Sequence, residues 1–363
     1  MGDLRPLARL PLLALGVLSL LGGVLAGLAR LGWSMPDTAA ATAGWHGALM
    51  ISAFLGTVIS LERAVAIGRG WAYLAPAAAG LGGVILLAGA PPILPQAILI
   101  VAAVTLVAAS VEVLRRLLAS FTLVLLLGAL CWLVGNLAWL ATGLATAAVP
   151  WWLAFLVLTI AGERLELTRY LATPAMAQRL FFAIVAVILV GATTSFWQED
   201  AGLRIFAAGL LALAAWLWRF DIARRNARQS GLVRFIAICL LSGYVWLALA
   251  GLIGISGGFL PGHPWRDAAL HAVGLGFVFS MIFGHAPIIF PAVARVKIPY
   301  HPAFYLPLLI LHASLVLRVA GVLSGEFALR QEGGLINAVA LLIFILAMVI
   351  SVVRGKRDVK GGA

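Results

Sequence analysis

The sequence of 363 residues is 63% hydrophobic and only 10% charged, and its mean hydropathy is +1.10. A soluble domain cannot cover so much apolar surface with so few polar groups, so the composition excludes a soluble protein and predicts a polytopic membrane protein. The net charge of +12 agrees with basic cytoplasmic loops that contact anionic lipid headgroups, and it does not require nucleic acid as a partner.

A helix needs about 20 apolar residues to cross a bilayer. Charged or Pro- and Gly-rich breaks divide the chain into twelve such segments, which predicts an all-α polytopic fold with one transmembrane domain over residues 1–363. The first segment begins like a signal peptide, but its apolar stretch is longer than a signal's, so we expect a retained helix. The predicted spans are 7–29, 40–61, 72–90, 93–113, 119–142, 149–168, 177–197, 202–219, 233–256, 265–290, 302–323 and 333–353.

Most of the 25 Lys and Arg residues fall in segments that share one side of the membrane if the N-terminus is cytoplasmic. Basic residues concentrate on the cytoplasmic side of membrane proteins. With an even number of spans, both termini are therefore expected in the cytoplasm.

Four histidines fall inside predicted spans, where ionisable residues are costly and mark functional sites. His46 is in the second span, His271 and His285 are in the tenth, and His312 is in the eleventh. On a helix, the spacing of His271 and His285 returns to within about 40° of the same face and climbs about 21 Å. Cytochrome b type proteins carry two stacked haems on such a pair, although they repeat it on a second helix and this chain does not.

A better partner for His271 is His46, because each lies about six residues into its span from the outer side. Two imidazoles at one depth could ligate a single haem iron on both faces. Arg266, beside Trp265 at the outer interface, could then bind the haem propionates. Alternatively, each histidine is a hydrogen-bonded packing residue.

In the inner half, His285 and His312 are candidates for a second haem or metal site. Arg318 lies six residues beyond His312 in the eleventh span. A buried guanidinium needs compensation, so Arg318 should find a carboxylate, a carbonyl or a haem propionate.

A second set of charges lies at the inner ends of the second and sixth spans, in Glu62-Arg63 and Glu163-Arg164. Adjacent helical residues point in different directions, so cross-pairing of Glu62 with Arg164 and of Glu163 with Arg63 would neutralise all four. The functional alternative is a proton or quinol path in which Glu163 and Glu166 share one helix face.

These residues recur on spans two, six and ten. A chain of twelve helices with this period of four resembles subunit I of heme-copper oxidases, which is built as three four-helix arcs and holds a low-spin haem between histidines of helices two and ten. The copper ligands of helices six and seven have no counterpart here. A usual oxygen-reducing centre is therefore not expected, and oxidoreductase activity stays open.

The segments WHGALMISAFLGT and LHAVGLGFVFSMIFGH are more similar to the NnrS family, a twelve-helix group associated with haem, copper and the bacterial response to nitric oxide. The resemblance implies a bacterial inner-membrane protein with haem, of b type, and allows copper. It also implies electron transfer or the handling of nitric oxide or metals. The expected partners are the lipid bilayer and a quinone or a redox protein, and nitric oxide is an expected ligand. Two alternatives are a two-haem quinone-linked cytochrome b and a cofactor-free secondary transporter that uses the buried Glu, Arg and His residues.

Overall fold

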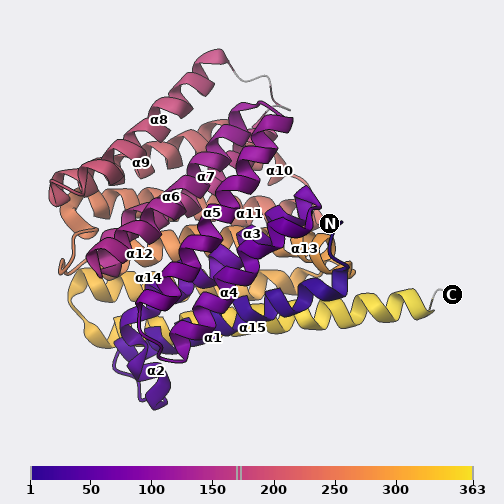
Figure 1. Ribbon diagram of the computed structural model, residues 1–363, viewed down its shortest axis with the longest axis horizontal. Helices are drawn as coiled ribbons and strands as arrows, with labels where there is room; N and C mark the ends of the chain where they lie inside the picture. The colour runs from indigo at the N-terminus through magenta and orange to yellow at the C-terminus, as the bar shows by residue number, and fades with distance from the viewer. Residues whose placement is uncertain (1, 169–170, 172–173, 362–363) are drawn as a thin grey trace. The chain divides into compact units, whose positions relative to one another are not determined.

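The computed structural model describes residues 2–168, 171 and 174–361 (Figure 1). Twelve of its helices are long and apolar enough to cross a membrane, and the described residues contain no strand. The all-α polytopic class is therefore confirmed. The chain divides into two compact units, residues 1–162 and 163–363, with the boundary inside the sixth spanning helix. This division separates two groups of six spans and does not follow the period of four.

Unit 1 begins with a helix that packs against the second and third spans, and its fourth span packs between the third and the fifth. Its elements are α1 (Pro6–Arg30), α2 (Asp37–Ala41), η1 (Ala43–Trp45), η2 (Ala48–Leu55), α3 (Gly56–Ile67), η3 (Gly70–Tyr73), α4 (Leu74–Leu87), α5 (Ile93–Arg116), α6 (Ser120–Thr142) and α7 (Ala145–Thr168), the last of which continues into unit 2.

The core of unit 1 contains a buried polar network centred on Asn136 of α6. Its amide oxygen accepts hydrogen bonds from Ser52 Oγ at 2.8 Å and from Trp152 Nε1 at 2.9 Å. Its amide nitrogen donates to the Leu99 carbonyl at 3.1 Å, and Trp132 Nε1 donates to Ser52 Oγ at 2.9 Å. Polar groups inside a membrane protein need such partners, so this network ties α5, α6 and α7 to the second span.

Unit 2 contains two helical hairpins, α8 with α9 and α14 with α15, while α11 packs against α9, η5 and α13. Its elements are α8 (Ala175–Thr194), α9 (Glu199–Phe220), α10 (Ala223–Asn226), α11 (Gly231–Ile253), η4 (Gly254–Gly258), α12 (Arg266–His271), η5 (Ala272–Phe279), α13 (Ser280–Ala294), η6 (Pro302–Phe304), α14 (Tyr305–Ser324) and α15 (Phe327–Gly361).

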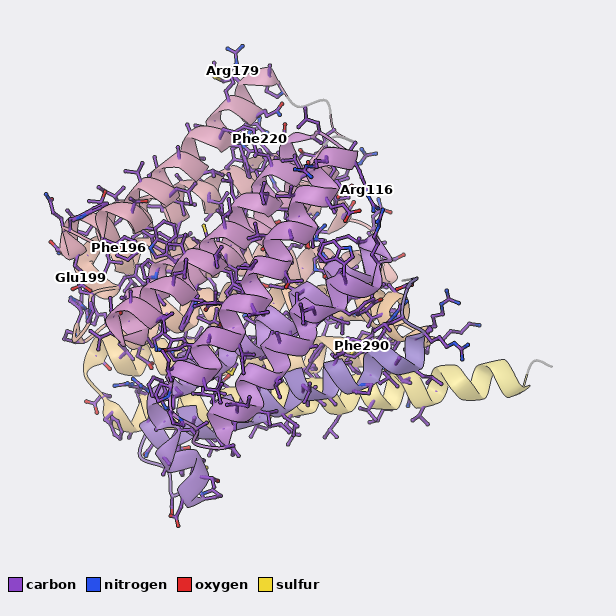
Figure 2. The ribbon with its side chains drawn as sticks, in the orientation of Figure 1. Arg116, Arg179, Phe196, Glu199, Phe220 and Phe290 are labelled. Atoms are coloured by element: carbon purple, nitrogen blue, oxygen red, sulfur yellow. The ribbon has the colours of Figure 1, made fainter. Side chains whose placement is uncertain are left out.

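The α8–α9 hairpin shows how glycine permits close helix packing. A Cβ atom at Gly191 would collide with the backbone of Phe206, and one at Gly202 would collide with the backbone of Ser195. In this hairpin, Arg179 lies at one end and Glu199, with Phe196, lies at the other (Figure 2). This placement of Arg179 agrees with the expected excess of basic residues on one side of the membrane.

The largest departure from the predicted spans concerns the second. Residues 37–45 form two short helices, and the span itself covers Ala48–Ile67 instead of 40–61. His46 therefore lies two residues before the span, whereas His271 lies five residues after the start of its span at Arg266. The helix boundaries do not reproduce the equal depths inferred from the sequence, because hydropathy counted the apolar residues of α2 and η1 as part of the span.

Candidate functional site

His46 lies between the end of η1 at Trp45 and the start of the π-helical segment η2 at Ala48. Its ring packs against α1. The Nδ1 atom is 2.7 Å from the Gly23 carbonyl oxygen. A carbonyl can only accept, so Nδ1 carries the proton and Nε2 carries the lone pair that a metal would require. A Cβ atom at Gly27 would lie 2.8 Å from the ring, so only a glycine there lets the imidazole lie this close to α1.

His271 closes α12 and has the same tautomer. Its Nδ1 atom is 2.8 Å from the Asp267 carbonyl oxygen and 3.4 Å from the Asp267 carboxylate. Hydrogen bonds from a ring nitrogen to a carbonyl or a carboxylate are the usual way in which proteins orient metal-binding histidines.

The Asp267 carboxylate is held by two arginines of the following spans. Arg318 donates from Nε and Nη2 at 2.8 and 2.7 Å, and Arg330 lies 3.6 Å away. The expectation that Arg318 finds a carboxylate is confirmed. Two guanidinium groups therefore share this one carboxylate.

An eight-residue π-helix begins two residues after His46 and immediately after His271. The segment η2 begins at Ala48, and η5 begins at Ala272. Long π-helical segments are rare and occur frequently at functional sites. Beside His271, a Cβ atom added at Gly274 would meet no atom of unit 2 within 4 Å, so this part of η5 leaves open space where a bulky flat group could approach.

Arg266, the predicted propionate ligand, donates from Nη1 to the Phe259 carbonyl. It thus links the start of α12 to the loop that precedes it. Trp265 in turn donates its backbone N–H to His263 Nδ1 at 3.1 Å within the same loop.

His285 belongs to a different cluster at the other end of the tenth span. Its Nδ1 atom is 2.8 Å from the Met281 carbonyl, which again fixes the proton on Nδ1, and its Nε2 atom is 3.4 Å from Arg164 Nη1. Arg164 Nε donates to Asp221 at 2.8 Å. The buried phenol of Tyr244 interacts electrostatically with both partners of this ion pair.

His312, by contrast, uses both ring nitrogens for hydrogen bonds. Trp246 Nε1 donates to its Nδ1 at 2.9 Å, so the proton is on Nε2, which donates to Ser242 Oγ at 3.0 Å. The ring also stacks on the indole of Trp246. His285 and His312 therefore have separate partners, and this arrangement leaves His312 no lone pair for a metal. Among the described residues no group of three or more His, Cys, Asp or Glu side chains could hold a metal ion.

Within unit 2, Arg164 of the predicted charge network has an ion-pair partner, and the cross-pairing with Glu62 and Arg63 stays a prediction. Arg164 pairs with Asp221, an acid that the sequence interpretation did not name. Glu62 interacts electrostatically with its neighbour Arg63 on α3. Glu163 lies beside Arg164 on α7 and acts on it electrostatically, and Glu166 is on the same helix within unit 2.

Three residues of these clusters were missed in the sequence. Asp267 had a usable signal, because it lies four residues before His271 and therefore on the same helix face. Arg330 and Asp221 had no such signal in the sequence, because both lie at helix ends, where charged residues are common.

A search of curated proteins finds no match for this chain. A protein-family model described as "Domain of unknown function (DUF8744)" matches residues 9–353, which covers all twelve spans except the ends of the first and the last. His46 and His271, the π-helix that follows each of them and the arginine-bound Asp267 all lie within this matched region. The chain therefore belongs to the DUF8744 family.

Proposed function

We propose that this protein is a haem-binding membrane protein in which His46 and His271 are the axial ligands. The observation that carries the proposal is their shared tautomer: each ring donates from Nδ1 to a backbone carbonyl and so keeps the lone pair on Nε2. The π-helix that follows each histidine is further support.

A haem held by two histidines is low-spin and supplies electron transfer. The protein's own residues would then have distinct tasks. The glycines of α1 position the His46 ring, and the Asp267 carbonyl fixes the tautomer of His271. The guanidinium groups of Arg318 and Arg330 would favour the haem propionates near His271.

The similarity to the NnrS family extends this proposal to physiology. We infer a role in nitric oxide or respiratory stress, by electron transfer or by handling nitric oxide or metals, in a bacterial inner membrane with both termini in the cytoplasm. The haem would be of b type, copper could accompany it, and a quinone or a redox protein would exchange electrons with it.

The test is the visible spectrum of the detergent-solubilised protein, oxidised and reduced, with elemental analysis for iron and copper. We expect a Soret band that is lost in His46→Ala and in His271→Ala and retained in His312→Ala. Absence of a Soret band after expression with adequate haem would reject the haem proposal. A band retained in both single variants would reject these two ligands.

A cofactor-free secondary transporter is the second candidate, favoured by the division into two six-span units and by the buried Arg164–Asp221–His285 cluster. Buried ionisable groups in spanning helices are typical of substrate and proton paths. This candidate predicts a colourless protein that moves a solute or protons when reconstituted in liposomes, with the movement lost in Asp221→Asn.

A further inference from the structure

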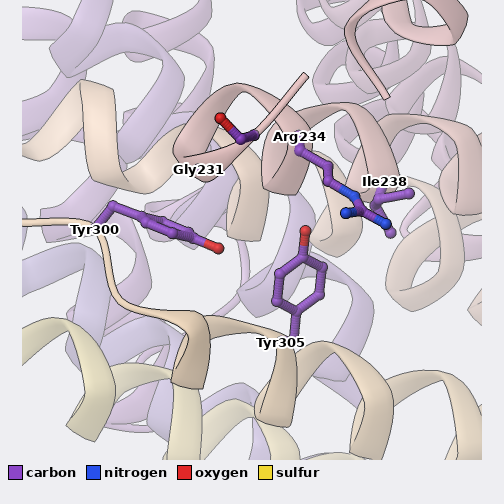
Figure 3. A pocket seen from close by; sticks show the side chains of 6 residues that line it. Gly231, Arg234, Ile238, Tyr300 and Tyr305 are labelled. Carbon is purple, nitrogen blue, oxygen red and sulfur yellow. The ribbon is translucent and has the colours of Figure 1, made fainter. Parts of the chain in front are cut away.

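Unit 2 contains a pocket of about 430 Å³ where the ninth and eleventh spans begin (Figure 3). Its lining residues come from the start of α11, from the loop that precedes η6 and from the first residue of α14: Ser230, Gly231, Arg234, Ile238, Tyr300 and Tyr305. The volume lies within the range of about 300–1,000 Å³ that is usual for small-ligand sites. None of these residues belongs to the histidine clusters.

The charge of the pocket is positive. Arg234 is in the first turn of α11, a helix that has no acidic residue in that turn and no side-chain cap. A helix N-terminus carries partial positive charge, so a cation there is unfavourable unless an anion is nearby. Within the part of the chain that the structure describes, no ion pair joins Arg234 to an acid, and no carboxylate lines the pocket.

The other polar groups of the lining are hydroxyls. Tyr300 and Tyr305 turn their phenol oxygens toward the space between the loop and α11 (Figure 3), and Ser230 adds a third hydroxyl at the start of α11. A guanidinium together with several O–H donors matches the oxygens of a phosphate group.

The surface beside the pocket is apolar. Leu306 and Leu309 follow Tyr305 on α14 and are 53% and 67% exposed, and Val233 precedes Arg234 and is 46% exposed. In a spanning helix such residues face lipid. A ligand with a phosphate head and hydrocarbon chains would match both the pocket and its border.

We propose that this pocket binds the phosphate headgroup of an anionic phospholipid. The preference for a net negative lipid follows from Arg234, because no carboxylate lines the pocket to offset its charge. Arg234 is the principal contact, and the two tyrosines orient the phosphate.

Native mass spectrometry of the purified full-length protein tests this proposal, with phosphatidylglycerol or phosphatidylcholine titrated into the detergent. Arg234→Gln should weaken phosphatidylglycerol binding about tenfold, the usual loss for one charge-assisted contact. Tyr300→Phe combined with Tyr305→Phe should weaken it severalfold. The matched control is Arg228→Gln, which removes an equal charge from an exposed residue outside the pocket and should change binding less than threefold.

Thermal melting by tryptophan fluorescence shows whether each variant is folded, and the comparison uses only variants that melt like the parent chain. Equal losses of phosphatidylglycerol binding in Arg234→Gln and Arg228→Gln would indicate diffuse electrostatic attraction and would contradict binding in the pocket. Equal binding of phosphatidylcholine would overturn the anionic preference. Full competition by inorganic phosphate at the lipid's own concentration would identify a free anion as the ligand and overturn the lipid assignment.

Discussion

Arg164 Nε and Asp221 Oδ2 are 2.8 Å apart, and their side chains are only 4% and 1% exposed. Removing one partner leaves the other as an uncompensated buried charge, so Asp221→Ala should lower the free energy of unfolding by about 3–5 kcal/mol. Unfolding in mixed detergent micelles measures this. The control is Asp200→Ala, whose ion pair with Arg204 is about half exposed on both sides and should contribute at most about 1 kcal/mol.

A double variant distinguishes the free-energy cost of an unpaired buried charge from the cost of lost packing at the same two positions. Replacing both partners, as in Arg164→Met with Asp221→Leu, removes the unpaired charge and should restore most of the stability that the single variant loses. If the double variant is no more stable than Asp221→Ala, the loss comes from packing and the electrostatic explanation is wrong.

The network around Asn136 gives a second stability prediction. Asn136→Ala leaves the buried donors of Trp152 and Ser52 without their acceptor, and each unsatisfied group costs about 1–3 kcal/mol. The melting temperature should fall accordingly. Thr193→Ala is the control, because its exposed hydroxyl bonds only to its own helix, and it should stay within about 0.5 kcal/mol of the parent chain.

Gly27→Ala probes the position of the His46 ring. The new Cβ atom would lie 2.8 Å from Cε1 and Nδ1, so the ring must move away from the Gly23 carbonyl. Under the proposed function, the haem bound per chain, measured from the Soret band, should fall. Gly44→Ala adds the same methyl group where no atom lies within 4 Å and should retain the parent haem content; equal loss in both variants would contradict a positioning role for Gly27.

His312→Leu distinguishes a packing histidine from a ligand. The Trp246 indole would lose its acceptor, so stability should fall by about 1–3 kcal/mol. The visible spectrum per folded chain should be unchanged, because both ring nitrogens of His312 are already used. A loss of absorbance without a loss of stability would show that His312 binds the cofactor.

The spans could be predicted because a helix in lipid must be apolar for about 20 residues, and hydropathy measures this directly. The sequence could predict that Arg318 pairs with an acceptor, because a buried guanidinium requires one. It could not identify Asp267 as that acceptor. The π-helices that end before Gly56 and before Ser280 could not be predicted, because a shift of backbone hydrogen bonding by one residue leaves the apolar pattern almost unchanged. The roles of the histidines differ through single hydrogen bonds, such as the one from Trp246, and these depend on tertiary packing.

The surroundings of the two proposed ligands are completed at different stages of synthesis. The glycines that fix His46 belong to the helix that precedes it, so this ring can adopt its orientation as soon as the second span enters the membrane. His271 receives its full set of neighbours only when Arg318 and Arg330 have followed it. A chain stalled after the tenth span would therefore contain one oriented imidazole and one whose supporting carboxylate still lacks its arginines.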